Sequence, residues 1–367
     1  MIDTVIEDLF NVNLGIRKEE RLLVFTDDER KETGEIGSLF AKAGEKFAKE
    51  IMYIEFRSTG CHGVEPPLRI WEKAFGVKAC NELARKGYLE PLINKKLREE
   101  GIKEVEKIIA SHKDEAVDAV IALSHYSTSH TRFRKMLTTI CRARYASMPL
   151  FDRHMLTGAM GVDWEKMAKR TAGIAERVNE CENIEINTPN GTSVRFSRKG
   201  REAKEDTGIL TEPGSFSNLP AGEVYLAPLE GSAEGRLVLE WAPTRKLDTP
   251  VTIYIEKGKA VKIEGNEPFV EYLEEKLSED RKNRNIAELG IGTNDKAARP
   301  DNILESEKIL GTIHIALGDN SSFGGKVSTP FHQDFVFFRP TVTLICENGE
   351  RKEILRDGRL SEIKGMI

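Results

Sequence analysis

The segment Arg21–Phe56, RLLVFTDDERKETGEIGSLFAKAGEKFAKEIMYIEF, indicates the fold of the first half of the chain. Its first five residues, Arg21–Phe25, form an apolar run typical of a buried strand, and Ile51–Phe56 form a second such run. Between them, Ile36–Glu50 repeats apolar side chains at helical spacing. A strand, a helix and another strand in this order favour two parallel strands that are joined by a crossover helix.

The same alternation of strands and helices continues to about residue 180. The further elements that we expect are a charged helix over Leu97–His112, a buried strand over Ala116–Leu123, a basic helix around Thr131–Arg144, a short strand over Tyr145–Leu150 and a connecting helix over Trp164–Val178. We therefore predict an α/β fold whose N-terminal domain, residues 1–182, is a doubly wound, open, mostly parallel sheet with helices on both faces.

From about residue 183 the pattern changes to short strands that are separated by turn residues. Asn190-Gly191 and Asn348-Gly349 each lie between two alternating apolar and polar runs, so both predict β-hairpins. A third hairpin is expected around Lys257-Gly258-Lys259. Residues 183–367 are thus expected to form a C-terminal, strand-rich α+β domain, and the candidate metal ligands described below lie in it.

Composition and charge exclude several classes of protein. The 367 residues, 39% of them hydrophobic, suffice for two domains with cores. Acidic and basic side chains, 60 against 55, are interspersed, so we expect no nucleic-acid partner. The longest apolar run, near Ala119–Leu123, is far shorter than a membrane span, and the first residues lack a basic leader, so we predict a cytoplasmic protein without a membrane partner. Five scattered cysteines argue against a disulfide framework and a zinc–thiolate cluster.

His332 and Asp334 form an H-x-D pair that predicts two converging metal ligands. On a strand, residues two apart project from the same face, so both side chains can reach one ion. The following run, Phe335–Phe338, is apolar, which places the pair at the edge of a buried strand. A surface strand would instead solvate both groups.

His314 lies in the apolar, strand-like segment Gly311–Gly318. Taken alone, it also fits a hydrogen-bonded histidine of the core. A single loop, Asp319–Pro330, can connect this strand to the one that carries His332 and Asp334. The three residues together predict a metal site, because two imidazoles and a carboxylate suit zinc, cobalt, manganese or non-haem iron.

Three glutamates are further candidates for this site. Glu223 and Glu288 each begin an apolar, strand-like run, and an isolated buried charge is costly, so each must be paired, protonated or bound to metal. Each also fits a helix cap or a salt-bridged edge residue. Glu307 lies seven residues before His314 and fits either a ligand or an ordinary solvated helix turn.

Four motifs in the second half resemble the metal-binding motifs of the aminopeptidase T/aminopeptidase S family of metallo-aminopeptidases. In chain order they are Asn218–Val224, Ala287–Gly292, Gly311–Gly318 and His332–Phe335. The resemblance covers most of the chain and is looser before residue 180. It implies a homodimeric exopeptidase that uses water activated by two metal ions (zinc, cobalt or manganese) to remove the N-terminal residue of a peptide substrate. The metal ligands that it implies are Glu223, Glu288, Glu307, His314, His332 and Asp334, with Glu223 and Glu288 also serving as catalytic carboxylates.

The chain departs from this family at Ser321, seven residues after His314, where the hydrolases commonly carry a tyrosine. The proposed donor to the tetrahedral intermediate is therefore missing or substituted. The corresponding family glutamate is also usually closer to the histidine than Glu307 is.

A metallo-aminopeptidase is our main prediction, and a ring-cleaving dioxygenase for dihydroxypyridines, to which this fold family is similar, is the alternative. In that enzyme His314, His332 and Asp334 would hold one ferrous ion, and Glu223 and Glu288 would be neighbouring groups or general bases. Loss of the tyrosine fits this alternative. A third interpretation is a binding or structural protein that has kept the ligands and lost turnover.

Overall fold

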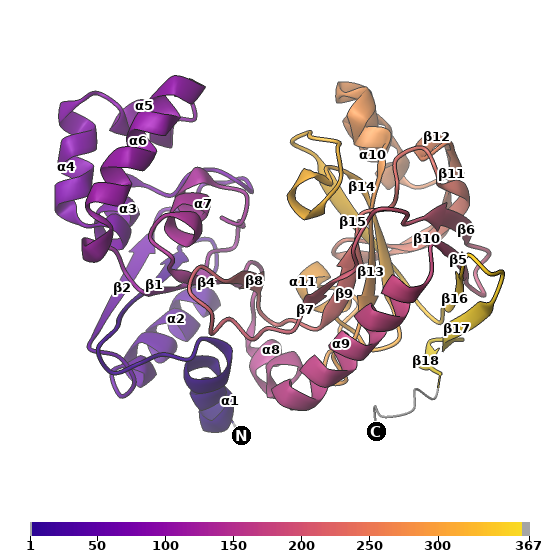
Figure 1. Ribbon diagram of the computed structural model, residues 1–367, viewed down its shortest axis with the longest axis horizontal. Coiled ribbons are helices and arrows are strands. Elements are labelled where there is room, and N and C mark those ends of the chain that lie inside the picture. The colour runs from indigo at the N-terminus through magenta and orange to yellow at the C-terminus, as the bar shows by residue number, and fades with distance from the viewer. Residues whose placement is uncertain (1, 362–367) are drawn as a thin grey trace. The chain divides into compact units, whose positions relative to one another are not determined.

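The computed structural model describes residues 2–361, which divide into two compact units (Figure 1). The first unit contains the chain up to Gly161 together with Gly208–Pro220, and the second contains Val162–Thr207 and the chain from Ala221 onward. This division differs from the expected boundary at residue 182. Helix α9 (Trp164–Glu180) packs on strands of the second unit, so it belongs there rather than before the boundary.

A parallel five-stranded sheet forms the centre of the first unit. Its order is β2-β1-β3-β4-β8, and each strand runs parallel to its neighbours. The strands are β1 (Arg21–Asp27), β2 (Glu50–Phe56), β3 (Ala119–Leu123), β4 (Arg144–Ser147) and β8 (Phe216–Asn218). The edge strand β8 was not predicted. It pairs with β4, so the segment Gly208–Pro220 belongs to the first unit although it follows part of the second unit in the sequence.

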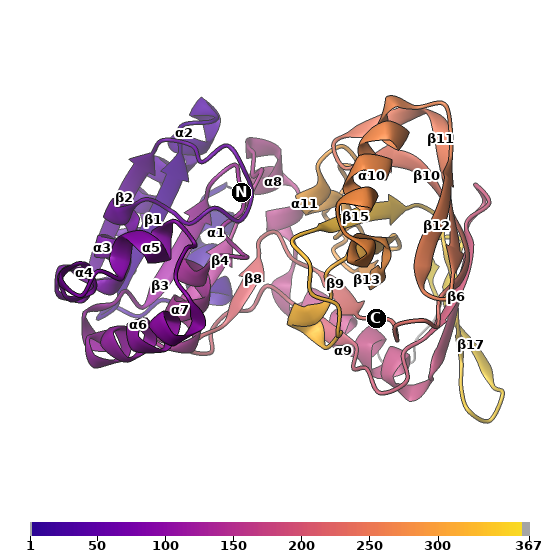
Figure 2. The same cartoon turned by 90° about the horizontal axis from the view of Figure 1, so that it is seen from above.

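Helices cover both faces of this sheet, as predicted (Figures 1 and 2). Leu23 and Phe25 point into a core that they share with residues of α3–α7, whereas the intervening Val24 is buried on the opposite face, where α1, α2 and α8 lie. The helices are α1 (Ile2–Asp8), α2 (Lys31–Gly44), α3 (Leu68–Phe75), α4 (Val77–Arg85), α5 (Leu89–Ile93), α6 (Glu99–Ser111), α7 (Arg132–Thr139) and α8 (Arg153–Thr157). No helix within residues 2–361 is long and apolar enough to cross a membrane.

The second unit consists of two antiparallel sheets that share one apolar core. The larger sheet has the order β12-β11-β10-β6-β5-β16-β17-β18, and the smaller has the order β15-β14-β13-β9-β7. All three predicted hairpins are confirmed as β5–β6, β11–β12 and β16–β17. The predicted fold class, a parallel α/β domain followed by a strand-rich α+β domain, is therefore confirmed.

The strands of the larger sheet are β5 (Asn183–Asn187), β6 (Ser193–Ser197), β10 (Glu234–Ala242), β11 (Arg245–Glu256), β12 (Lys259–Glu264), β16 (Thr341–Ile345), β17 (Arg351–Arg356) and β18 (Arg359–Leu360). Those of the smaller sheet are β7 (Lys204–Asp206), β9 (Glu223–Leu226), β13 (Ile286–Gly292), β14 (Ile313–Gly318) and β15 (His332–Phe337). The remaining helices are α10 (Pro268–Glu279) and α11 (Ile303–Ser306).

Cys181 and Cys346 form a disulfide, which the scattered positions of the cysteines did not predict. Strand β5 begins at Asn183 opposite Ile345, the last residue of β16, so the two cysteines meet just beyond the paired ends. They are 165 residues apart in the sequence, so their spacing gave no indication of this contact.

Candidate metal centre

The smaller sheet of the second unit has one apolar face and one face that carries charged and imidazole side chains. Residues such as Leu289 and Ile315 point into the core. On the other face, Ala316 of β14 lies between Glu288 of β13 and Asp334 of β15. Because side chains alternate along each strand, His314 of β14 and His332 and Asp334 of β15 project from this same face.

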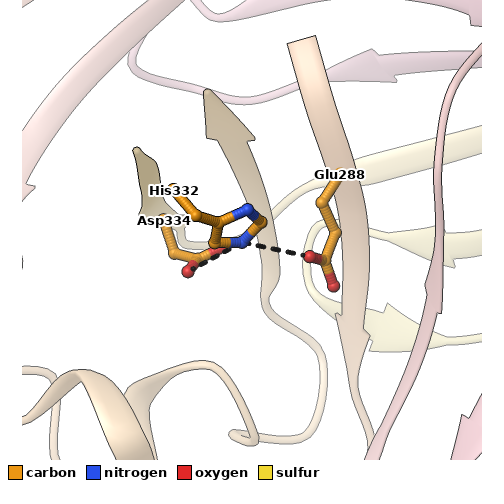
Figure 3. Close-up of side chains that lie close together, drawn as sticks. All are labelled: Glu288, His332 and Asp334. Atoms are coloured by element: carbon orange, nitrogen blue, oxygen red, sulfur yellow. Dashed lines mark ion pairs between the residues drawn. The ribbon is translucent and has the colours of Figure 1, made fainter. Parts of the chain in front are cut away.

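Three of these side chains, Glu288, His332 and Asp334, converge on one point (Figure 3). Each offers a ligand atom, and these atoms all lie within 4.8 Å of one another. Nε2 of His332 is 3.3 Å from Oε2 of Glu288 and 3.4 Å from Oδ2 of Asp334. The other Asp334 oxygen, Oδ1, is buried and has no hydrogen-bond partner within the described part of the chain. A cation at this point would satisfy that oxygen.

His314 and Glu223 extend the same cluster across the sheet. Nε2 of His314 lies 3.7 Å from Oε1 of Glu288 and 3.5 Å from Oε2 of Glu223. The His314 ring lies across Gly290, where an added Cβ would stand 1.9 Å from its Cε1 atom. Glycine at this position is therefore what allows the imidazole to lie flat on β13.

A β-bulge in β13 determines which way Glu288 points. Ile286 pairs with Leu317 and Glu288 pairs with Ala316, so the register shifts by one residue between them. Ile286 accordingly lies in the core, whereas Glu288, two residues later, lies on the opposite face with the histidines. Simple alternation would have placed both side chains on one face. Bulges of this kind re-aim side chains beside functional sites.

The His332 ring is oriented by a hydrogen bond to the backbone. Its Nδ1 lies 2.8 Å from the carbonyl oxygen of Asp319. A carbonyl only accepts hydrogen bonds, so Nδ1 carries a proton, and Nε2, which faces Glu288 and Asp334, is the nitrogen that can bind a metal ion once it loses its own proton.

Opposite charges in the cluster shift the pKa values of its members. Burial disfavours a charged imidazole, but the hydrogen bond to Glu288 and the surrounding carboxylates outweigh it and raise the pKa of His314 to about 9. Burial is likewise outweighed at His332, mainly by Asp334, and its pKa lies well above the ordinary value. The two histidines in turn lower the pKa values of Glu288 and Asp334 against the effect of burial. The carboxylates of the cluster therefore stabilise a positive charge placed between them, whether on an imidazole or on a bound cation.

Glu307 does not lie in a solvated turn. It follows α11 with its side chain 13% exposed, and the neighbouring Lys308 side chain is 1% exposed. Nζ of Lys308 is 2.6 Å from Oε1 of Glu223 and 3.4 Å from Oε2 of Glu307. Burial and the charge of Asp334 raise the pKa of Glu307 to about 8. Lys308 was not identified from the sequence. The available indication was its position six residues before His314, which lies in an apolar strand.

Ser321 lies in a short 3-10 turn, Ser321–Phe323, in the loop before β15. Its hydroxyl hydrogen-bonds to the Asp319 carboxylate, at 3.0 Å from Oδ1 and 3.1 Å from Oδ2. The side chain is thus engaged within its own loop, and it does not supply the phenol that the peptidase prediction requires.

A family model described as 2,5-dihydroxypyridine 5,6-dioxygenase matches residues 153–362, which is more than half of the chain. The chain belongs to this family. A curated relative, the 2,5-dihydroxypyridine 5,6-dioxygenase of Pseudomonas putida, is 26% identical over 182 residues. That match covers 45% of this chain and 52% of the relative, so it spans about half of the relative's length.

Two solved structures share the fold over almost the whole chain. The 2,5-dihydroxypyridine dioxygenase of Pseudomonas putida KT2440 has a TM-score of 0.71 at 16% identity, covering 99% of this chain and 97% of its own. Wild-type aminopeptidase T (AmpT) of Thermus thermophilus has a TM-score of 0.60 at 15% identity, covering 98% and 99%. The likeness to aminopeptidase T is thus one of fold.

These comparisons correct the main functional prediction. The expected peptide-hydrolysing metallo-aminopeptidase is wrong, because the family match is to an oxidoreductase. The motifs that suggested a peptidase supply the charged face of the smaller sheet, and candidate ligand residues alone do not specify which reaction a site performs.

Proposed function

We propose that this chain is a ring-cleaving dioxygenase that uses a single ferrous ion and acts on 2,5-dihydroxypyridine or a closely similar hydroxylated ring. The observation that carries the proposal is the convergence of His332 and Asp334 with Glu288, whose carboxylate also lies 3.7 Å from Nε2 of His314 on the neighbouring strand. Two histidines and one carboxylate that leave coordination positions open are the typical ligand set of non-haem iron oxygenases. In place of the two ions expected from the peptidase motifs, we propose one.

The donor atoms present fit such an ion. Nε2 of His332 is the nitrogen that faces the site, because Nδ1 is hydrogen-bonded to the carbonyl of Asp319, and it can coordinate an ion that displaces its proton. Oδ1 of Asp334 is buried without a hydrogen-bond partner in the described residues, and His314 presents Nε2 to Glu288 and Glu223. When bound, ferrous iron supplies the activation of dioxygen that a ring cleavage requires.

Glu288 is the group best placed to receive a proton from the substrate. It contacts both histidines, which lower its pKa, so it is a carboxylate at neutral pH. A hydroxyl of the substrate must lose its proton for the ring to become electron-rich, and a carboxylate within hydrogen-bonding reach can accept that proton. In this role Glu288 is a general base beside the three proposed iron ligands.

The direct test is oxygen consumption by the iron-loaded protein. Protein that is purified without metal and reconstituted with ferrous iron should consume one dioxygen for each 2,5-dihydroxypyridine, and both atoms of labelled dioxygen should enter the ring-opened product. Zinc-loaded protein is the control and should be inactive. Iron binding without oxygen consumption would instead favour the interpretation as a metal-dependent binding protein.

A further inference from the structure

Lys308 is a buried cation at the edge of the candidate metal centre. Its side chain is 1% exposed, and its ammonium group lies 2.6 Å from Glu223 and 3.4 Å from Glu307. Removing an ammonium from water is costly unless carboxylates pair with it, and removing one partner of a buried pair leaves an uncompensated charge. The position of Lys308 therefore depends on these two glutamates, and they in turn depend on it.

The backbone holds Lys308 rigidly against the end of β13. Its carbonyl accepts a hydrogen bond of 2.8 Å from the Asn294 amide, and the Leu310 amide donates to the Asn294 carbonyl at 3.0 Å. A Cβ added at Gly292 would lie 2.1 Å from the Ile309 carbonyl oxygen, so the segment packs directly on the strand. This packing positions the Lys308 ammonium between the carboxylates of Glu223 and Glu307.

We propose that the Lys308 ammonium occupies the place that a second metal ion would take between Glu223 and Glu307, and thereby limits the centre to one ion. This inference rests on the proposed function, since it takes the first ion to be the one held by His314, His332 and Asp334. A two-metal centre needs carboxylates that are free to bridge or bind a second cation. Here Oε1 of Glu223 already contacts the ammonium, and only Oε2 faces His314.

The test is the number of manganese ions bound per chain, measured by elemental analysis after equilibrium dialysis. The wild-type protein should bind one ion. Lys308→Met keeps a long unbranched side chain but removes the charge, so Glu223 and Glu307 become free and the protein should bind two. Lys308→Arg keeps a cation and should bind one.

The double variant Glu307→Gln, Lys308→Met is the matched control. It removes the ammonium as Lys308→Met does and replaces the Glu307 carboxyl group by an amide of the same shape, so the second ion loses one of its two carboxylates. It should bind one ion. Two ions in this control would overturn the assignment of Glu307 as a partner of the second cation.

The outcomes separate this inference from the proposed function. One ion in both the wild type and Lys308→Met would overturn the role of Lys308 and leave the iron site standing, whereas no ion in the wild type would overturn the proposed function. If Lys308→Met fails to fold, wild-type crystals soaked in manganese decide the matter by anomalous scattering. A single peak near His314, His332 and Asp334 supports the inference, and a second peak between Glu223 and Glu307 overturns it.

Discussion

Nδ1 of His332 donates a hydrogen bond to the backbone carbonyl of Asp319 across 2.8 Å, and this contact determines which ring nitrogen is available to a metal ion. The carboxylate of the same Asp319 accepts hydrogen bonds from the amides of Ser321 and Thr329. The aspartate therefore shapes the loop with its side chain and orients the imidazole with its carbonyl. Groups that orient metal ligands in this way typically affect metal affinity strongly.

Asp319→Ala should loosen the loop and weaken metal binding by about 10-fold to 100-fold, because the His332 ring loses its fixed orientation. Calorimetric titration with manganese measures this change. Ser321→Ala is the matched control, since it removes only a hydroxyl that bonds to Asp319, and its affinity should stay close to that of the wild type. Equal losses in both variants would mean that the Ser321 hydroxyl, rather than the bonds of the Asp319 carboxylate to the Ser321 and Thr329 amides, holds the carbonyl that orients the ring.

His314→Ala and Asp334→Ala should each abolish ring cleavage and lower iron content, because each removes a proposed ligand. The circular dichroism spectrum should be unchanged, since neither side chain belongs to the apolar core. Iron content is measured by elemental analysis. His112→Ala is a suitable control, because this histidine pairs with Glu82 in the first unit and should be dispensable for metal binding. Full iron content in His314→Ala would refute its assignment as a ligand.

Gly290→Ala should displace the His314 imidazole, because the new methyl group would stand 1.9 Å from Cε1 and 2.1 Å from Nε2. We expect a loss of about 1–3 kcal/mol in the free energy of unfolding and a large loss of metal affinity. Chemical denaturation and metal titration measure the two effects. Gly161→Ala, whose Cβ would meet Val5 at an ordinary 3.9 Å, is the control and should change neither. Normal iron content in Gly290→Ala would show that the ring position is not required.

Metal binding should strengthen as pH rises from about 6 to about 9, because the imidazoles must lose their protons to coordinate and the pKa of His314 is raised to about 9. Each proton released adds about tenfold in affinity per pH unit. Manganese titrations in buffers of different ionisation enthalpy measure both the affinity and the protons released. An affinity that does not change over this range would contradict the assignment of the histidines as ligands.

The same pKa predicts the opposite trend for the stability of the metal-free protein. His314 has a higher pKa in the folded chain than its ordinary value of 6.5, so its pairing with the carboxylates stabilises the fold fully below about pH 6.5. This stabilisation is lost as pH rises through about 9. Urea denaturation of metal-free protein at the two ends of this range measures the loss, and His314→Ala should reduce this pH dependence.

Local patterns in the sequence predicted the elements of the fold well. Asn190-Gly191 and Asn348-Gly349 gave hairpins because two-residue turns constrain the strands beside them. The H-x-D spacing of His332 and Asp334 placed both side chains on one strand face. In each case the determining contacts lie within a few residues of the pattern, so the sequence carries them directly.

Features that depend on distant contacts escaped this reasoning. The disulfide between Cys181 and Cys346 depends on the pairing of β5 with β16, and the edge strand β8 depends on a late return of the chain. Lysine side chains are normally exposed, and the residues next to Lys308 in the sequence did not indicate otherwise. Its burial is possible because Glu223 and Glu307, which the fold brings to it, pair with the ammonium group. The reaction was not predictable either, since the same ligand types serve hydrolysis and oxygenation.

The location of the protein in the cytoplasm and its assembly as a homodimer remain predictions.

The register shift in β13 affects how this strand tolerates a change of length. The extra residue allows Ile286 to lie in the core while Glu288, two positions later, faces the histidines. Deleting Ala287 would make these two residues neighbours in a regular strand, and they would still point to opposite faces. The segment can therefore lose one residue without turning either side chain away from its place.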